Sequence, residues 1–235
     1  MRKLGAIVSS FYHPYGLIFI SSLLVSCSVA ARIPTVSDER VENLVKAEAA
    51  QIIAVTDDRE NISQYQLSLS DFPRKDIMGL STGKRRIYIN YALAKAALNN
   101  TRYRWQLRQT LAHEIAHELA GHANQSGTTS FNRSEQGRGV TGADLGLPGN
   151  VAFRSYSVEK ELEADFLGMN YWRKLRWDCR IWVHILEGFR DRNYSGDSLH
   201  PTDKRLEQAV NACAASRKSA GAAAAATNPA RSPNS

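Results

Sequence analysis

Two histidines and a glutamate stand close together in the segment His113-Glu114-Ile115-Ala116-His117. On a helix, His113 and His117 lie on the same face one turn apart, so both imidazoles can bind a single metal ion. Glu114 is rotated from His113 by about 100°, so it can stand beside a zinc-bound water without binding the metal. Zinc lowers the pKa of such a water to about 7, and a carboxylate can take its proton as the water attacks a carbonyl group. The spacing therefore predicts a hydrolytic zinc site with Glu114 as the general base.

An acidic segment further along the chain, residues 159–165, offers a third ligand. Catalytic zinc sites normally use three protein ligands and leave one position open. Glu161 and Asp165 share a helix face by the same four-residue spacing, whereas Glu163 points away from it. We therefore expect Glu161 to bind the zinc. Asp165 would orient one of the histidines, because a metal-bound histidine nearly always donates its second ring N–H to a partner.

These motifs together resemble a family of zinc endopeptidases. HExxH, followed by Glu161-Leu162-Glu163-Ala164-Asp165 and by His200-Pro201 with basic residues after it, is similar to HtpX, the CAAX prenyl endopeptidase and the periplasmic BepA-like proteins. The resemblance covers about residues 105–210. It implies a zincin-like peptidase domain of the gluzincin type, and it implies these roles: zinc ligands His113, His117 and Glu161, base Glu114, and supporting residue Asp165.

The resemblance also points to residues near the last helix. His200 matches a family histidine that can approach the metal, where it would either stabilise the oxyanion or block the open position. Arg205 is a second candidate for holding the oxyanion. A histidine before a proline is also common at a helix start, and the sequence leaves these alternatives open. The chain departs from its relatives at Val158 and in residues 79–83, and the latter region would shape the strand that binds substrate.

Mainly helices are expected to position these residues. Apolar periodicity and capping signals predict helices and two alternating segments predict short strands. The expected helices span about residues 37–55, 92–99, 101–120, 157–176 and 178–189, with another after Pro201, and the strands span 65–70 and 86–91. The predicted fold is α+β and predominantly helical, with one helix carrying HExxH, a second carrying Glu161, and a small sheet. An extended substrate would add beside an edge strand at Arg86–Tyr91.

The two ends of the chain are expected to lie outside the domain. Residues 1–27 have basic residues, a short apolar run and a small residue, as in a secretory signal peptide. Leu24-Val25-Ser26-Cys27 resembles a bacterial lipobox, which implies a lipid anchor on Cys27 in the outer membrane; an ordinary signal peptide or an uncleaved anchor is the alternative. Residues 28–213 would form a single zinc metallopeptidase domain. Residues 214–235, rich in Ala, Ser and Pro, would be a disordered tail.

Other residues with reactive side chains receive weaker assignments. Cys179 and Cys213 can pair in an oxidising compartment, or Cys213 can be a buried thiol, and the sequence leaves this open. The Gly-rich residues 127–149 are expected to be a long loop that could close over the site. His122 is expected to make a local contact, and His184 to be a core or boundary histidine.

The composition bounds the function classes. The chain has 235 residues, 30 Lys and Arg against 23 Asp and Glu, and a net charge of +7. Its basic residues are dispersed without an aromatic-basic stripe, so a nucleic-acid partner is not expected. The prediction is a zinc endopeptidase facing the periplasm and acting on protein or peptide substrates; the resemblance suggests misfolded envelope proteins. The alternative is a protease-like chaperone or assembly factor whose zinc site is held closed by His200.

Overall fold

The computed structural model describes residues 33–72, 77–123, 156–191 and 202–226, which belong to one compact unit, Ala31–Ser235. The expected leader with Cys27, the whole Gly-rich segment 127–149 and His200 lie outside the described residues. The described elements are α1 (Glu39–Ile53), the 3-10 helix η1 (Arg59–Gln64), β1 (Gln66–Ser70), β2 (Gly79–Ser81), β3 (Arg86–Asn90), α2 (Tyr91–Ala97), α3 (Thr101–Leu119), α4 (Val158–Lys174), α5 (Cys179–Arg190) and α6 (Thr202–Ala226). The prediction of an α+β, predominantly helical fold is confirmed.

Polar side chains fix where the helices begin. The Asn100 carboxamide oxygen accepts hydrogen bonds from the backbone of Arg102 and Tyr103 at the start of α3, and Ser157 accepts one from Lys160 at the start of α4. Such caps satisfy backbone N–H groups that have no partner within the first turn. At α1 the cap is Asp38, one residue after the start of the range 37–55 expected from the sequence. The two helices that carry the candidate site therefore begin at positions set by their own sequences.

The sheet has the strand order β1-β3-β2. β1 runs parallel to β3 and β2 runs antiparallel to it, with Leu80 opposite Tyr88. The expectation that Arg86–Tyr91 forms the substrate-binding edge is therefore wrong, because β3 is the central strand. β2 is an edge strand instead. Its three residues, Gly-Leu-Ser, are too few to show the alternation by which strands are found in a sequence.

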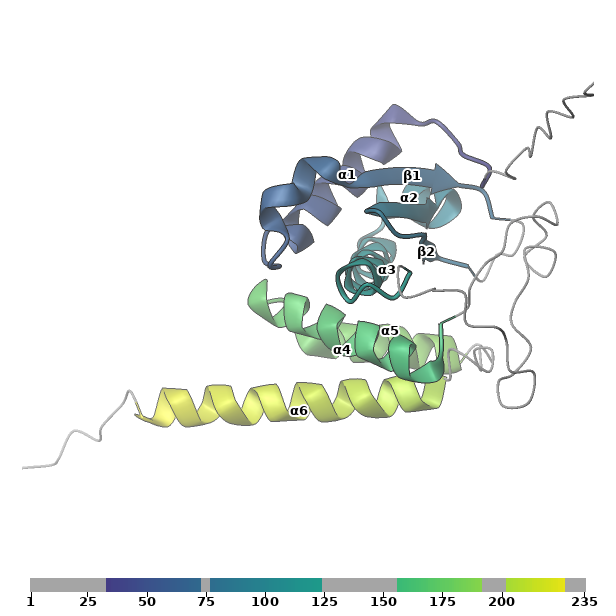
Figure 1. The fold of residues 1–235 in the computed structure, drawn as a ribbon. Coiled ribbons are helices and arrows are strands. Elements are labelled where there is room, and N and C mark those ends of the chain that lie inside the picture. Colours follow the sequence, from purple (N-terminus) through teal and green to yellow (C-terminus); the bar gives the residue numbers. More distant parts are fainter. Residues whose placement is uncertain (1–32, 73–76, 124–155, 192–201, 227–235) are drawn as a thin grey trace, which may run out of the picture. The chain divides into compact units, whose positions relative to one another are not determined.

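Helix α3 runs through the middle of the unit, between the sheet and helix α4 (Figure 1). Helix α6 lies along α4 and α5, and α1 packs against α2, α3 and β1. The core joins apolar side chains from all these layers, which include Val41, Val45, Ile52, Ile87, Ile89, Leu107, Leu111, Ile115, Trp172, Trp182 and Leu186. Because α3 is covered on both sides, the residues of its HExxH segment are all buried.

Two features of the C-terminal helices decide questions that the sequence left open or answered differently. A disulfide joins Cys179 at the start of α5 to Cys213 in α6. Helix α6 continues to Ala226, so the prediction of a disordered tail is wrong for residues 214–226. The reason is composition: this stretch is rich in alanine, which has the highest helix propensity of all residues.

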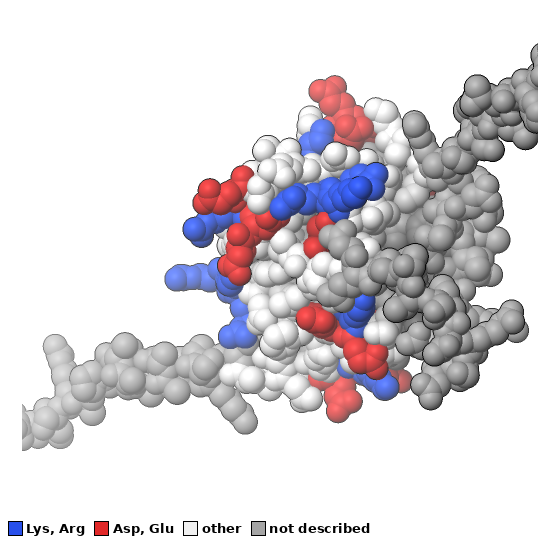
Figure 2. All heavy atoms as spheres, viewed as in Figure 1, with Lys and Arg blue, Asp and Glu red and all other residues white. Residues whose placement is uncertain are grey.

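Charged side chains of both signs are interspersed on the described surface that Figure 2 shows, where Lys and Arg lie next to Asp and Glu. This distribution agrees with the dispersed basic residues of the sequence. Within the ranges that the structure describes, no helix combines the length and the apolar character needed to cross a membrane.

Candidate metal centre

Close packing of α3 against α4 brings the candidate ligands together. Gly168 of α4 lies over the backbone of Ala112 in α3, where a Cβ atom would come 3.3 Å from the Ala112 carbonyl group and 2.8 Å from Cη2 of Trp182. A larger residue would hold the two helices apart. The close approach places Glu161, in the first turn of α4, opposite the HExxH segment of α3.

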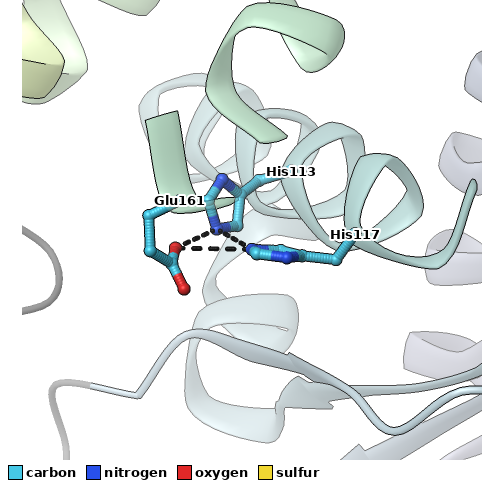
Figure 3. Close-up of side chains that lie close together, drawn as sticks. All are labelled: His113, His117 and Glu161. Carbon is cyan, nitrogen blue, oxygen red and sulfur yellow. Dashed lines mark hydrogen bonds and ion pairs between the residues drawn. The ribbon is translucent and has the colours of Figure 1, made fainter. Parts of the chain in front are cut away.

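Three buried side chains converge on one point (Figure 3). Nε2 of His113 lies 3.0 Å from Nε2 of His117 and 3.1 Å from Oε2 of Glu161. The remaining distance, from His117 Nε2 to Glu161 Oε2, is 3.3 Å. Tetrahedral zinc with bonds of about 2.0–2.1 Å holds its ligand atoms roughly 3.3 Å apart. The spacing and the donor types therefore fit a single metal ion, and the predicted group of His113, His117 and Glu161 is confirmed as a group that could hold one.

The electrostatics of the cluster favour a cation. Burial disfavours a charge on His113, but its hydrogen bonds with Asp165 and Glu161 outweigh burial and raise its pKa to about 10. Burial, followed by the charge on His113, lowers the pKa of His117 to about 4. In the metal-free cluster, the buried Glu161 carboxylate therefore lies beside a protonated, positively charged His113. A metal ion can replace that proton, because imidazole binds metals in its neutral form.

Asp165 contacts His113 from the side away from the cluster. Its Oδ1 lies 2.9 Å from Nδ1 of His113. Arg205 of α6 donates from Nε to Oδ2 at 2.5 Å and from Nη2 to Oδ1 at 2.8 Å. Burial would raise the pKa of Asp165, but the charge and hydrogen bonds of Arg205 keep it well below its usual value. An ionised Asp165 keeps the His113 proton on Nδ1 and turns Nε2 toward the metal position.

The ion pair with Asp165 fixes the position of the Arg205 side chain. Its guanidinium lies on Asp165, so in this structure it acts on His113 through the carboxylate between them. Its role toward an oxyanion stays a prediction. The roles of His200 also stay predictions, since that residue is outside the described part of the chain.

Glu114 lies against the edge strand β2. Its Oε2 accepts a hydrogen bond from the backbone N–H of Ser81 at 2.8 Å. The contact depends on Gly79, where a Cβ atom would lie only 2.8 Å from Cγ of Glu114 and 2.7 Å from Cγ2 of Thr110. Glycine at this position therefore lets β2 lie directly against α3, beside the base that the HExxH pattern predicts.

Two residues near the site, Glu118 and Tyr156, belong to no motif in the sequence. Glu118, one turn after Glu114, accepts from Oγ of Ser81 at 2.8 Å and from the backbone N–H of Arg85 at 2.6 Å. It ties the β2–β3 turn to α3. The spacing of Glu118 from Glu114 could have placed both acids on one face, but only the folded chain shows which strand they meet.

Tyr156, just before α4, covers His117. The two rings are stacked, with centroids 4.1 Å apart and planes at 19°. The hydroxyl donates to the carbonyl oxygen of Ser81 at 3.1 Å. Burial, together with the charges of nearby carboxylates such as Glu114, raises the pKa of Tyr156 above its usual value, so the hydroxyl keeps its proton and remains a donor.

The two other described histidines have different surroundings. His122 makes the expected local contact: it is buried against His117, with the two Nδ1 atoms 2.9 Å apart. Burial lowers its pKa, although Glu163 acts against this shift. The expectation of a core or boundary position for His184 is wrong, because its side chain is 87% exposed. It lies on the outer face of α5, opposite Trp182 and Leu186.

Comparison with known proteins does not extend these findings: no protein-family model matches this chain, and no curated protein does. The chemistry that the site can perform therefore rests on its own residues.

Proposed function

We propose that this protein is a zinc-dependent endopeptidase with a zincin-like domain, which hydrolyses peptide bonds of extracytoplasmic proteins. The observation that carries the proposal is the convergence of His113 Nε2, His117 Nε2 and Glu161 Oε2 within 3.0–3.3 Å of one another. Two imidazoles and one carboxylate are the ligands of catalytic zinc in one major class of metallopeptidases. The sequence resemblance to the HtpX and BepA-like endopeptidases supports the same function.

In this proposal His113, His117 and Glu161 hold the zinc ion, which when bound would polarise the scissile carbonyl and acidify the attacking water. Glu114 accepts the proton of that water on its carboxylate and then gives it to the nitrogen of the departing amine. Asp165, fixed by Arg205, keeps the His113 proton on Nδ1 throughout. Burial of the side chains around the site excludes bulk water, which strengthens each of these interactions.

The edge of β2 is the proposed place for the substrate backbone. The backbone N–H of Thr82 donates to Arg86, and the carbonyl of Met78 accepts from Asn90, so these residues turn toward β3. Gly79 and Ser81 alternate with these residues and turn the other way, and the N–H and carbonyl of Ser81 meet Glu114 and Tyr156 instead. An extended peptide could pair with β2 on this side by exchanging with those contacts. Its scissile bond would then lie beside Glu114.

The proposed location is the bacterial envelope, facing the periplasm. The Cys179–Cys213 disulfide supports an oxidising compartment, since stable disulfides are rare in the cytosol. The leader and the lipobox-like segment ending at Cys27 support a lipid anchor in the outer membrane. Misfolded or envelope proteins are the proposed substrates, and quality control of such proteins would be the physiological role.

The deciding experiment measures casein hydrolysis and zinc content for the full chain, purified in detergent, as wild type and as Glu114→Gln. We expect the wild type to cleave casein with about one zinc per chain, and the variant to keep its zinc while activity falls by a factor of about 10²–10⁴. Glu60→Gln is the matched control, because Glu60 is 83% exposed.

The other outcomes are equally informative. Absence of zinc from the wild type would contradict the metal site and with it the whole proposal. Zinc without cleavage would contradict the peptidase activity and favour the gated chaperone or assembly factor. In that case His200→Ala should release the activity, because it removes the side chain expected to close the site.

A further inference from the structure

A chain of three side chains extends from the metal position toward the surface on the His117 side. His117 directs Nε2 to the cluster and Nδ1 to Nδ1 of His122, at 2.9 Å. On the far side of His122, Nε2 lies 3.2 Å from Oε2 of Glu163. His117 and His122 are both about 2% exposed as side chains, whereas Glu163 is 57% exposed. Neither His122 nor Glu163 belongs to the ligand group.

The direction of the hydrogen bonds follows once His117 binds a metal through Nε2. A neutral imidazole that uses one nitrogen as a ligand carries its proton on the other, so His117 must donate from Nδ1. Nδ1 of His122 must then accept, which places the His122 proton on Nε2. That nitrogen faces the Glu163 carboxylate, an acceptor. A single choice of tautomers therefore gives a donor and an acceptor in each contact: His117 donates to His122, and His122 donates to Glu163.

We propose that His122 is a positioning residue for the metal ligand His117, and that Glu163 holds His122 in the tautomer that accepts the His117 proton. The inference rests on the metal site of the proposed function. It gives His117 the kind of support that Asp165 gives His113. His122 comes from the turn that follows α3, and Glu163 comes from α4, so the helix pair that forms the site also forms its support.

The two supports differ in charge, which has a physical reason. Asp165 is an anion beside His113, and Arg205 neutralises it. In the part of the chain that the structure describes, no Lys or Arg is hydrogen-bonded behind His117 in this way, and a second anion in direct contact with it would add an unbalanced charge to the buried site. The neutral His122 accepts the hydrogen bond from His117 without adding a charge beside the site. The negative charge is instead on Glu163, which lies near the surface. Tyr156 also restrains the His117 ring, by stacking on one of its faces.

The test measures zinc affinity by competition with a chelator, and the visible absorption of the Co²⁺ form, for the full chain. His122→Leu removes the acceptor and leaves a buried donor on His117, so we expect zinc affinity to fall by about 10–100-fold and the Co²⁺ spectrum to change. His122→Asn keeps an acceptor oxygen close to the place of Nδ1 and should restore most of the affinity. Glu163→Ala should have a smaller effect, because water can reach its position.

The controls separate support of the metal from packing. His184→Leu and His184→Asn change an exposed histidine that also pairs with a glutamate, Glu187, and neither should alter zinc affinity. Unfolding temperatures of the metal-free variants report any loss of packing. Unchanged zinc affinity and an unchanged Co²⁺ spectrum in His122→Leu, or equal losses in the Leu and Asn variants, would overturn the inference alone. Failure of the wild type to bind zinc would overturn it together with the proposed function.

Discussion

Arg205 and Asp165 form a two-bond ion pair in the interior, and the same Asp165 oxygen that accepts from Nη2 of Arg205 also contacts Nδ1 of His113. The pair therefore links α6 to the candidate metal ligand, although the two residues are 40 positions apart in the sequence. It makes the orientation of His113 depend on a helix that supplies none of the three ligands.

Arg205→Ala should destabilise the protein and weaken zinc binding. It leaves the Asp165 carboxylate buried without its cation, a change that typically costs about 3–5 kcal/mol. The measurement is thermal unfolding together with chelator competition for zinc. Arg180→Ala is the matched control, because its pair with Asp178 is 70% and 40% exposed, and such pairs contribute about 0–1 kcal/mol. Equal effects of the two substitutions would contradict the role given to Arg205.

Gly79→Ala should impair hydrolysis while zinc remains bound. The added Cβ would lie 2.8 Å from Cγ of Glu114 and 2.7 Å from Thr110, so β2 or the Glu114 side chain must move. We expect kcat to fall at least about tenfold, the size of effect that misplacing a reacting group by a fraction of an ångström produces. Gly188→Ala is the control, since its Cβ would meet only the end of Arg102 at 3.4 Å. Retained activity in Gly79→Ala would argue against Glu114 as the base.

Zinc binding should release about one proton from the ligands at pH 6. His113, with a pKa of about 10 in the metal-free chain, is protonated at this pH, and His117, with a pKa of about 4, is not. Protons therefore compete with zinc for His113, and the apparent affinity should fall about tenfold for each unit by which the pH is lowered. Calorimetric titration in buffers of different ionisation enthalpy counts the protons. Heat that does not depend on the buffer would contradict the assignment.

Breaking the Cys179–Cys213 disulfide should lower stability. The bond closes a segment with a sequence separation of 34, for which chain entropy predicts a loss of about 4 kcal/mol. The double variant Cys179→Ser and Cys213→Ser tests this by thermal unfolding, and the wild type in reducing buffer should show the same shift. If reducing agent also lowered the unfolding temperature of the double variant, the reducing agent would be acting on something other than this disulfide.

Local spacing was enough to predict the group of side chains that could hold a metal ion. His113 and His117 are one helical turn apart, and Glu161 lies in the capped first turn of another helix. Helical periodicity fixes which side chains share a face before any tertiary contact forms. For the same reason the predominantly helical α+β class was predictable, and Asp165 could be expected to support a histidine.

The contacts between segments far apart in the sequence were decided only by the tertiary structure. The order β1-β3-β2, the place of Arg205 on Asp165 and the approach of Ser81 to Glu114 each depend on how separate elements pack, and no local pattern encodes this. The same holds for His122, whose role became visible only beside His117 and Glu163. By itself the sequence determined which side chains offer the donor atoms of the candidate site, because helical spacing places His113 and His117 on one face and Glu161 in the first turn of another helix. Packing decided which groups hold those donors in place, because burial, charge and hydrogen-bond partners are properties of the folded chain.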